Sequence, residues 1–170
     1  NQRSVLWDLN YFKYCFLKAT GMEFQEDKLE DDFHKMCDVL LRSSSATFMY
    51  RDFQSRNVMT KDGEPWLIDF QGGRKGPFYY DIASFLWQAK AKYPDSLRRD
   101  EAYFYSQLRH FVLFRTLQVL GAYGFRGYFE KKPHFIQSVP FAIANLRELL
   151  KEDFSEYPYL CEVLRELTGL

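Results

Sequence analysis

The sequence is poor in cysteine, and the few cysteines present exclude several classes of protein. Only three occur among the 170 residues, and no two form a Cys-x-x-Cys pair: Cys15, Cys37 and Cys161. Their spacing therefore indicates neither a zinc site nor a disulfide framework. The three histidines are equally scattered, so we expect no metal cluster from them. Unpaired thiols fit a reducing compartment, and we expect a cytoplasmic protein.

The sequence also lacks a surplus of charge of one sign and a long apolar run. The 23 basic and 23 acidic residues give a formal net charge of zero, which predicts no bulk attraction to nucleic acid or to an anionic membrane. No apolar run approaches the roughly 18 residues that a membrane-spanning helix needs. We therefore expect neither a nucleic-acid nor a membrane partner. The chain starts at Asn1 rather than Met, as a fragment or a processed chain would.

Apolar and aromatic side chains, by contrast, are abundant. Hydrophobic residues make up 46% and aromatic residues 19% of the sequence, which is typical of a globular domain or of one lobe of a larger protein. Near the start, apolar residues recur on one helical face: Val5, Leu9, Phe12 and Phe16. This period predicts a helix over residues 4–19 that ends at Gly21, and the same pattern predicts a helix over residues 26–42.

The second half of the chain also has a helical pattern. Predicted helices cover residues 82–90, 101–123, 135–151 and 159–167. Gly124 is expected to end the second of these helices. Pro140 marks either an early kink or a late start in the third.

A short β-rich segment separates the two helical parts. Its apolar runs "TFMY", "NVMT" and "PWLIDF" have strand character, and Asp62-Gly63 is typical of a hairpin turn. We expect "GGRKGP", residues 72–77, to be a loop. Three short strands so close together predict one small sheet rather than a βαβ unit. The predicted class is α+β, mostly helical, in a single domain over residues 1–170.

An unusual set of polar residues lies within this segment. Asp52 and Asn57 are five residues apart, and Asp69 follows twelve residues later, after what we expect to be a buried strand. Phosphoryl transfer from ATP needs a carboxylate that orients the attacking hydroxyl and oxygen ligands for Mg²⁺. Each residue alone has an ordinary alternative, because a lone Asp at a strand end is commonly a turn residue or a helix cap. The combination indicates a kinase-type catalytic loop.

Residues 50–69 resemble the catalytic core of the protein-kinase-like superfamily, in the branch of aminoglycoside phosphotransferases and choline kinases. There the loop reads His-x-Asp-x₄-Asn, and a metal-binding Asp follows a hairpin. The resemblance implies that Asp52 is the catalytic base or orients the hydroxyl, that Asn57 and Asp69 bind Mg²⁺, and that ATP is the co-substrate. It also implies the C-terminal lobe of a kinase-like fold, with a small β-hairpin insert that carries the catalytic loop.

Two further residues are expected to brace this loop. In "GPFYYDIASFLW", Asp81 matches a buried family Asp that opens a helix and supports the catalytic loop, and an ordinary N-cap is the alternative. Tyr50 stands where the family usually has His, and its hydroxyl and ring suit the same supporting role. Gln71 stands where protein kinases have the Gly of Asp-Phe-Gly, which disfavours a protein kinase.

A narrower resemblance is to the bacterial anomeric sugar kinases, which phosphorylate the 1-hydroxyl of N-acetylmuramate and N-acetylglucosamine in peptidoglycan recycling. It depends on four stretches: "LWDLNYFKYCFLK", "RDFQSRNVM", "IDFQGGRKGPFYYD" and "FRTLQVLGAYGF". This resemblance implies an amino sugar as the small-molecule acceptor. An aminoglycoside kinase or a choline-type kinase is the alternative.

Several polar residues are candidates for binding the phosphates or the acceptor. Arg115 and Gln118 interrupt an apolar helix, and a buried Arg needs a partner, either a structural carboxylate or a bound sugar or phosphate. Asp8 and Asn10 interrupt the first helix, where they are solvated or capping residues or line an acceptor pocket. Three arginines bring positive charge to the phosphate region, with simple solvation as the alternative for each: Arg51, Arg56 and Arg74.

One part of a complete kinase is lacking. A kinase fold has an N-terminal β-lobe with a Gly-rich phosphate-covering loop and a strand Lys paired with a helix Glu, and we find neither pattern near the start. We therefore expect a C-terminal lobe, feeble or inactive alone, whose ATP-gripping lobe belongs to the same polypeptide. The alternative of another class is a natural lobe-only protein that serves as a binding or scaffold module.

Overall fold

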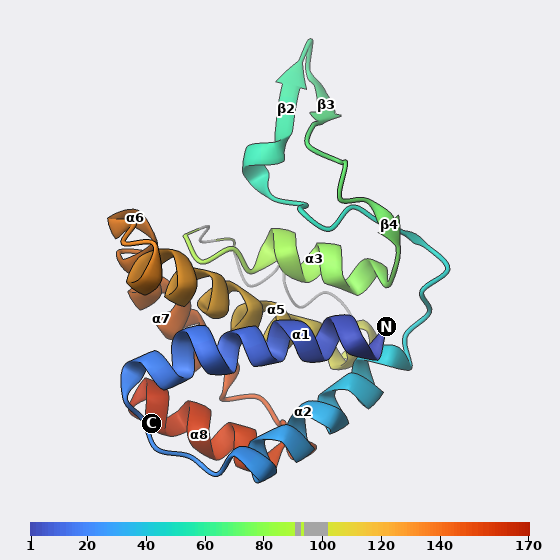
Figure 1. Ribbon diagram of the computed structural model, residues 1–170. Helices are drawn as coiled ribbons and strands as arrows, with labels where there is room; N and C mark the ends of the chain where they lie inside the picture. Colours follow the sequence, from blue (N-terminus) through green and yellow to red (C-terminus); the bar gives the residue numbers. More distant parts are fainter. Residues whose placement is uncertain (91–92, 94–101) are drawn as a thin grey trace. The chain divides into compact units, whose positions relative to one another are not determined.

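The computed structural model describes residues 1–90, 93 and 102–170 (Figure 1). The chain divides into two compact units: the helical unit, Asn1–Leu41 with Thr116–Leu170, and the hairpin unit, Arg42–Arg115. Helices dominate and the strands form small antiparallel sheets, which confirms the predicted mostly helical α+β class. None of the helices within the described residues is long and apolar enough to cross a membrane.

The helical unit begins with a helix that changes its winding along its length. Asn1 caps α1 (Gln2–Phe12) by accepting a hydrogen bond of 3.0 Å from a backbone amide of the first turn. A π-helical turn, Lys13–Leu17, and a 3₁₀ turn, Lys18–Thr20, follow without a break. Gly21, at a φ of 80°, ends the run in the left-handed conformation that favours glycine. The predicted stop is confirmed, but only the first part of the predicted helix is α-helical.

A buried carboxylate joins α2 (Glu26–Leu41) to α8 (Pro158–Thr168). Asp32 is 1% exposed and accepts hydrogen bonds from the Leu160 amide at 2.9 Å and the Lys35 ammonium at 2.8 Å. The Leu160 amide belongs to the first turn of α8, whose donors lack partners within the helix. Both helices were predicted, and their apolar faces contribute to the core: Leu29, Phe33, Met36, Leu40, Val163 and Leu164.

The prediction of a single helix over residues 135–151 is wrong. After a π-helical turn, Phe125–Phe129, the chain forms two helices, α6 (Pro133–Ile136) and α7 (Val139–Leu149). Pro140 lies in the first turn of α7, where its missing N–H removes no helical hydrogen bond. Of the two expected effects of Pro140, the late start is therefore the correct one.

Glycine allows α5 (Ala102–Gly124) to approach the first helix closely. A Cβ atom added to Gly121 would lie 2.9 Å from the Phe12 nitrogen. One added to Gly124 would overlap the Cys15 carbonyl oxygen, so no larger residue fits there. The α-helix ends at Gly124 as predicted, but Gly124 keeps a helical φ of −60° and the chain continues into a π-helical turn. The predicted start of α5, at residue 101, lies outside the described residues.

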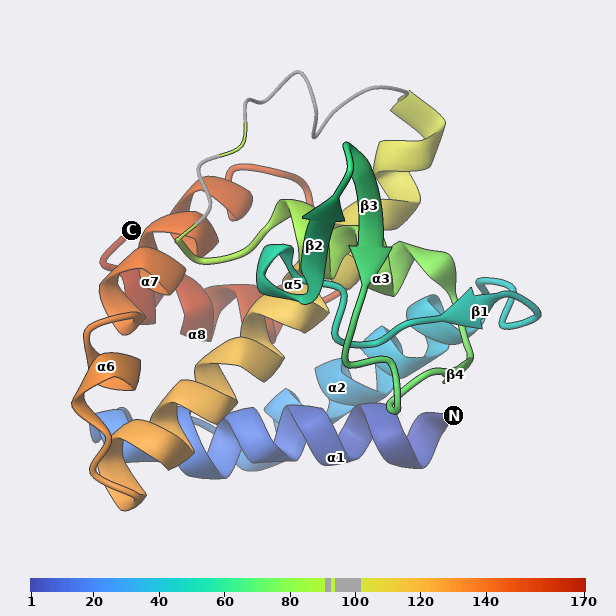
Figure 2. The same cartoon turned by 90° about the horizontal axis from the view of Figure 1, so that it is seen from above.

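The strands of the hairpin unit form two separate two-stranded sheets (Figure 1; Figure 2). β2 (Val58–Lys61) pairs antiparallel with β3 (Glu64–Leu67). β1 (Phe48–Met49) pairs antiparallel with β4 (Arg74–Lys75). The prediction of one three-stranded sheet is wrong, because residues expected to form a loop supply β4 as a partner for β1.

The turn between β2 and β3 is the two-residue loop Asp62-Gly63. Both residues have positive φ, 54° and 81°, as a type I′ hairpin turn requires. The strand before Asp69 was predicted to be buried, and this is wrong. β3 ends at Leu67, which is 48% exposed, and Ile68 is 45% exposed.

Helix α3 (Phe78–Leu86) begins and ends four residues before the predicted helix over residues 82–90. Its aromatic side chains contact the part of α5 that belongs to the hairpin unit. Tyr79 stacks on Phe111 with ring centroids 5.5 Å apart, and Tyr80 meets Phe114 at 6.3 Å. Such pairs bury large apolar surfaces and fix α3 against α5 within this unit.

Candidate active site

The candidate catalytic loop, residues 50–57, is held in shape by its last residue. The Asn57 side chain donates a hydrogen bond from Nδ2 to the Asp52 carbonyl oxygen at 2.8 Å, and the Asn57 backbone amide donates to the Gln54 carbonyl at 2.9 Å. Asn57 is only 5% exposed, so these bonds are shielded from water. Because the nitrogen of the side-chain amide is used, the acceptor atom Oδ1 is left for another partner.

The hairpin returns the chain so that Asp69 follows directly beside this loop. The Ile68 amide donates a hydrogen bond to the Asn57 carbonyl oxygen at 3.0 Å, one residue before Asp69. Asp69 is exposed and has a φ of 67°, a strained conformation for a residue other than glycine. A Cβ atom added to Gly72 would lie 3.8 Å from Oδ2 of Asp52. The loop and the segment around Asp69 therefore form one cluster within the hairpin unit.

Tyr50 connects the two sides of this cluster. It is buried, and its hydroxyl donates a hydrogen bond to the Ile68 carbonyl oxygen. Burial raises the pKa of the Tyr50 phenol, and the negative charges of Asp69, Asp52 and Asp81 raise it further. All three carboxylates raise the pKa of the same phenol, which also indicates that they lie near one another. The phenol stays protonated at neutral pH and can keep donating its hydrogen bond.

Asp81 joins α3 to the loop through two backbone amides. Its Oδ2 accepts a hydrogen bond from the Tyr50 amide at 2.5 Å, and its Oδ1 accepts one from the Arg51 amide at 2.8 Å. Pro77 occupies the N-cap of α3, so the alternative role of Asp81 as an N-cap is wrong. Burial raises the pKa of Asp81, while the two amide hydrogen bonds lower it. These bonds also hold Arg51 at its strained φ of 79°.

The cluster offers the donor atoms that Mg²⁺ prefers. Asn57 has a side-chain amide oxygen, and Asp69 has an exposed carboxylate. Mg²⁺ is usually bound by one or two carboxylates together with substrate phosphates and water. The donor set therefore fits a magnesium ion that binds together with a nucleotide. Within the described residues, no three His, Cys, Asp or Glu side chains form a metal-holding group.

The arginines predicted near the phosphates lie in the hairpin unit and have exposed side chains: Arg51, Arg56 and Arg74. Arg115 is half-buried and contacts α3. Its Nε donates a hydrogen bond to the Ser84 hydroxyl at 3.2 Å, and its guanidinium carbon lies 5.6 Å from the Tyr80 ring centroid. The structure therefore gives Arg115 partners within the protein.

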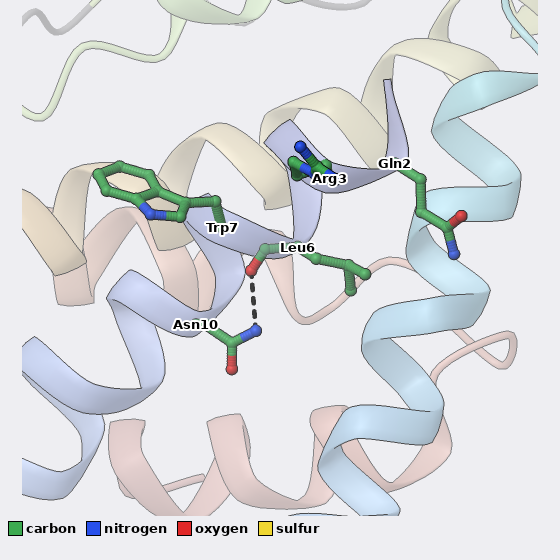
Figure 3. A pocket seen from close by; sticks show the side chains of 5 residues that line it. All are labelled: Gln2, Arg3, Leu6, Trp7 and Asn10. Carbon is green, nitrogen blue, oxygen red and sulfur yellow. Dashed lines mark hydrogen bonds between the residues drawn. The ribbon is translucent and has the colours of Figure 1, made fainter.

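The other substrate candidates lie in the helical unit and have structural contacts. Gln118 donates a hydrogen bond from Nε2 to the Asp8 carboxylate at 2.8 Å. Asn10 donates one from Nδ2 to the Leu6 carbonyl oxygen at 3.0 Å (Figure 3). Five residues of α1 line a shallow hollow on the surface: Gln2, Arg3, Leu6, Trp7 and Asn10 (Figure 3). Asn10 is the one candidate among them, and no residue of the candidate catalytic loop lines this hollow.

Sequence reasoning missed two side chains, Phe53 within the loop and Ser84 on α3. Phe53 stacks on Phe85 with centroids 4.8 Å apart and meets Tyr50 edge-on at 5.7 Å. Ser84 accepts the hydrogen bond from Arg115. The helical period places Ser84 on the same face of α3 as Tyr80, one turn later, and could have identified it. No local pattern marks Phe53 as a packing residue.

Comparison with known proteins defines the class of this protein. The sequence model of the phosphotransferase enzyme family matches residues 17–115, more than half of the chain. The chain therefore belongs to the phosphotransferase enzyme family.

Two curated relatives have the same name, N-acetylmuramate/N-acetylglucosamine kinase. The protein from Pseudomonas aeruginosa is 31% identical over 92 residues, which are 52% of this chain and 27% of the relative. The alignment with the protein from Neisseria meningitidis serogroup B is 26% identical over 194 residues. This alignment covers 99% of this chain and 57% of the relative. The chain thus spans little more than half the length of the second relative. Both the family and the narrower resemblance to sugar kinases are confirmed.

Proposed function

We propose that the chain is the catalytic part of a cytoplasmic, ATP- and Mg²⁺-dependent kinase that phosphorylates a hydroxyl of an amino sugar. Membership of the phosphotransferase family supports the transfer and implies ATP as the co-substrate. The shared name of the two relatives supports a sugar such as N-acetylmuramate or N-acetylglucosamine, and hence cell-wall sugar recycling. The observation that carries the proposal is the loop cluster of Asp52, Asn57 and Asp69.

In this proposal each residue of the cluster has one task. Asp52 orients the acceptor hydroxyl and takes its proton as the oxygen attacks the terminal phosphorus of ATP, and the bond to the leaving ADP breaks. Asn57 holds the Asp52 backbone through its nitrogen and presents its oxygen to the metal, and Asp69 supplies a carboxylate ligand. Bound Mg²⁺ would neutralise phosphate charge. Phosphoryl transfer needs positioning more than covalent chemistry, and the two braced loops supply this chain's share of that positioning.

The proposed enzyme needs a further part that grips ATP. Both relatives are longer than this chain. We infer that an N-terminal lobe of the same polypeptide completes the site, and that residues 1–170 are a kinase-like C-terminal lobe that is feeble or inactive alone. Exposed arginines of the hairpin unit remain candidates for neutralising phosphate, and Asp8, Asn10 and Gln118 remain candidates for the sugar.

Two alternatives make different predictions. An aminoglycoside or choline-type kinase would use the same cluster on another acceptor. A non-catalytic scaffold would not need an amide oxygen and a carboxylate on adjacent loops. The gene sequence upstream separates the scaffold from the enzyme, because only the enzyme requires a preceding β-rich segment with a strand Lys.

Activity of the complete polypeptide tests the proposal. With ATP and Mg²⁺ we expect phosphate transfer to N-acetylmuramate or N-acetylglucosamine, and little transfer to kanamycin or choline. Asp52→Ala should lower kcat by a factor of about 10³, within the range of general-base catalysis. Asp31→Ala, at an exposed position of α2, is the matched control and should keep the wild-type rate. A wild-type rate in Asp52→Ala would refute its role, and transfer to kanamycin alone would refute the acceptor.

A further inference from the structure

We propose that the shallow hollow on α1 is a binding site for an N-acetylated sugar, in which Trp7 stacks on the sugar ring and Arg3 binds a carboxylate. The hollow lies within the helical unit and no residue of the candidate catalytic loop lines it, so it adds a binding site to the proposed transfer reaction. The identity of the sugar rests on the proposed function. The shape and the chemistry of the hollow do not depend on it.

The hollow follows two neighbouring columns of side chains along α1 (Figure 3). One column consists of Gln2, Leu6 and Asn10, which succeed one another at intervals of four residues. Arg3 and Trp7, with the same interval, form the second column beside it. Side chains four residues apart lie on the same face of a helix, so all five share one side of α1. The hollow has a volume of about 480 Å³, which lies within the roughly 300–1,000 Å³ of small-molecule sites.

Trp7 gives the hollow a flat aromatic surface that is open to solvent. The residue is 67% exposed, and its indole lies nearly parallel to the Tyr11 ring, with an interplanar angle of 5° and centroids 5.6 Å apart. This stacking supports the indole and leaves most of its surface accessible. The face of an aromatic ring is electronegative. The axial C–H groups on one face of a pyranose are slightly positive, so the two faces attract each other.

Amide side chains of the first column bring hydrogen-bonding groups to the hollow. Asn10 donates from Nδ2 to the Leu6 carbonyl oxygen at 3.0 Å, so its Oδ1 remains available as an acceptor (Figure 3). Gln2 donates from Nε2 to Nδ1 of His34 on α2 at 3.4 Å, and its Oε1 likewise remains an acceptor. Sugar hydroxyl groups and the N–H of an acetamido group are the donors that match these two oxygens.

Arg3 makes the hollow electropositive. Its side chain is exposed, and no carboxylate is among the residues that line the hollow. A guanidinium binds a carboxylate through two parallel hydrogen bonds. N-acetylmuramate carries a carboxylate on its lactyl ether, whereas N-acetylglucosamine is neutral. The hollow should therefore bind both sugars and prefer N-acetylmuramate.

The size and composition of the hollow favour a small polar ligand over a protein partner. A stable protein interface involves about 20–30 residues on each side, whereas five residues of one helix line this hollow. A single exposed tryptophan on a plain surface would need no explanation. Here the exposed ring is bordered by two amides and a guanidinium. A pyranose, with its C–H face and its rim of hydroxyl groups, has the complementary arrangement.

The 170-residue chain, without nucleotide, allows the test. ¹H–¹⁵N NMR would follow the Trp7 indole and the Asn10 side-chain amide during titration with N-acetylglucosamine and with N-acetylmuramate. We expect both signals to shift and saturate, with a Kd of about 1 mM because a shallow hollow covers only part of the sugar. For N-acetylmuramate we expect about threefold tighter binding.

The other tryptophans reveal binding elsewhere on the chain. Trp66 and Trp87 belong to the hairpin unit, so their indole signals report on that unit. Shifts confined to these two signals would overturn the proposal. A Trp7 shift that stays linear up to the highest sugar concentration would also overturn it, because it would indicate a solvent effect rather than a site.

Two variants separate stacking from charge. Trp7→Leu keeps apolar bulk but removes the flat ring, so it should weaken binding of both sugars about tenfold, with Asn10 as the remaining probe. Arg3→Gln should abolish the preference for N-acetylmuramate and leave the affinity for N-acetylglucosamine unchanged. Arg165→Gln, at an exposed position of α8, is the matched control and should keep both affinities.

The outcomes for the two residues are independent of kinase activity. Wild-type affinities in Trp7→Leu would refute stacking on the ring, and an unchanged preference in Arg3→Gln would refute the carboxylate contact. No step of the titration uses ATP. Loss of the proposed kinase function would therefore leave the binding result intact, and failure of sugar binding to the hollow would leave the role of Asp52 untouched.

Discussion

The two units of the chain differ in how they treat their polar groups and their backbone. The helical unit pairs its buried charges internally: Lys13, fully buried, forms ion pairs with Glu26 at 3.3 Å and Glu30 at 2.6 Å. The hairpin unit instead contains several residues with strained backbone conformations. Of the four non-glycine residues with positive φ in the described chain, three belong to this unit: Arg51, Asp62 and Asp69.

This difference indicates where stability and function are located. Tight backbone packing and paired charges lower the free energy of the helical unit, whereas the hairpin unit tolerates strain at the residues proposed to act on substrate. Strain that persists at a few loop residues is typical of functional sites. If the comparison is correct, substitutions in the helical unit should mainly reduce stability, and those in the hairpin unit should mainly reduce activity.

The largest effect is expected at Gly124 in the helical unit. Gly124→Ala would place a methyl group onto the Cys15 carbonyl oxygen, so α5 and the first helix would have to separate. We expect a loss of about 3 kcal/mol or more in the free energy of unfolding, measured by urea denaturation. Gly72→Ala in the hairpin unit is the matched control, because its new methyl group would meet its nearest neighbour at 3.6 Å. Equal losses in both variants would contradict the comparison.

Two aspartates that accept hydrogen bonds from backbone amides give an intermediate test. Asp32→Ala leaves the Leu160 amide of α8 without its acceptor and should cost about 2 kcal/mol of stability, with kcat per folded molecule unchanged in the complete polypeptide. Asp81→Asn keeps one acceptor for the loop amides but loses the second. It should cost less stability and lower kcat about tenfold or more. Urea denaturation and steady-state kinetics on both variants would decide, and a reversed pattern would invalidate the assignment of roles.

The smallest effect concerns pH and again compares Asp81 with its neutral variant. The pKa of Asp81 is raised in the folded state above its ordinary value of 3.8, chiefly by burial. The folded protein therefore binds this proton more tightly than the unfolded chain does. The resulting stabilisation is complete below the ordinary value and is lost as the pH rises through the folded-state pKa. The stability of wild type relative to Asp81→Asn should thus fall over that interval, as followed by urea denaturation at successive pH values. A constant difference would show that Asp81 titrates alike in both states.

Much of the fold could be predicted from the sequence because its helices have strong apolar periods. Helices α2 and α8 form close to the predicted bounds for this reason. β4 could not be predicted, since two residues in a Gly-rich loop become a strand only when β1 is beside them. Gly124 was predicted as the end of its helix, but its close contact with the first helix has no local pattern in the sequence.

The candidate site shows the same limit. Spacing and chemistry predict Asp52, Asn57 and Asp69 as candidates, because these residues belong to a compact motif. The partner of Arg115 could not be identified, since sequence indicates that a buried Arg needs a partner but not which one. Its hydrogen bond to Ser84 joins residues 31 positions apart, and such pairs have no local pattern.

The β2–β3 hairpin has a consequence for handling the isolated chain. Its strands pair only with each other within the described residues, and each has an outer edge of backbone groups open to solvent. Large apolar side chains accompany these edges, with Met59 52% and Trp66 57% exposed. Open edges with apolar side chains recruit strands from neighbouring molecules. Concentrated solutions of the 170-residue chain should therefore become turbid, and dilute, cold samples are the appropriate choice for spectroscopy.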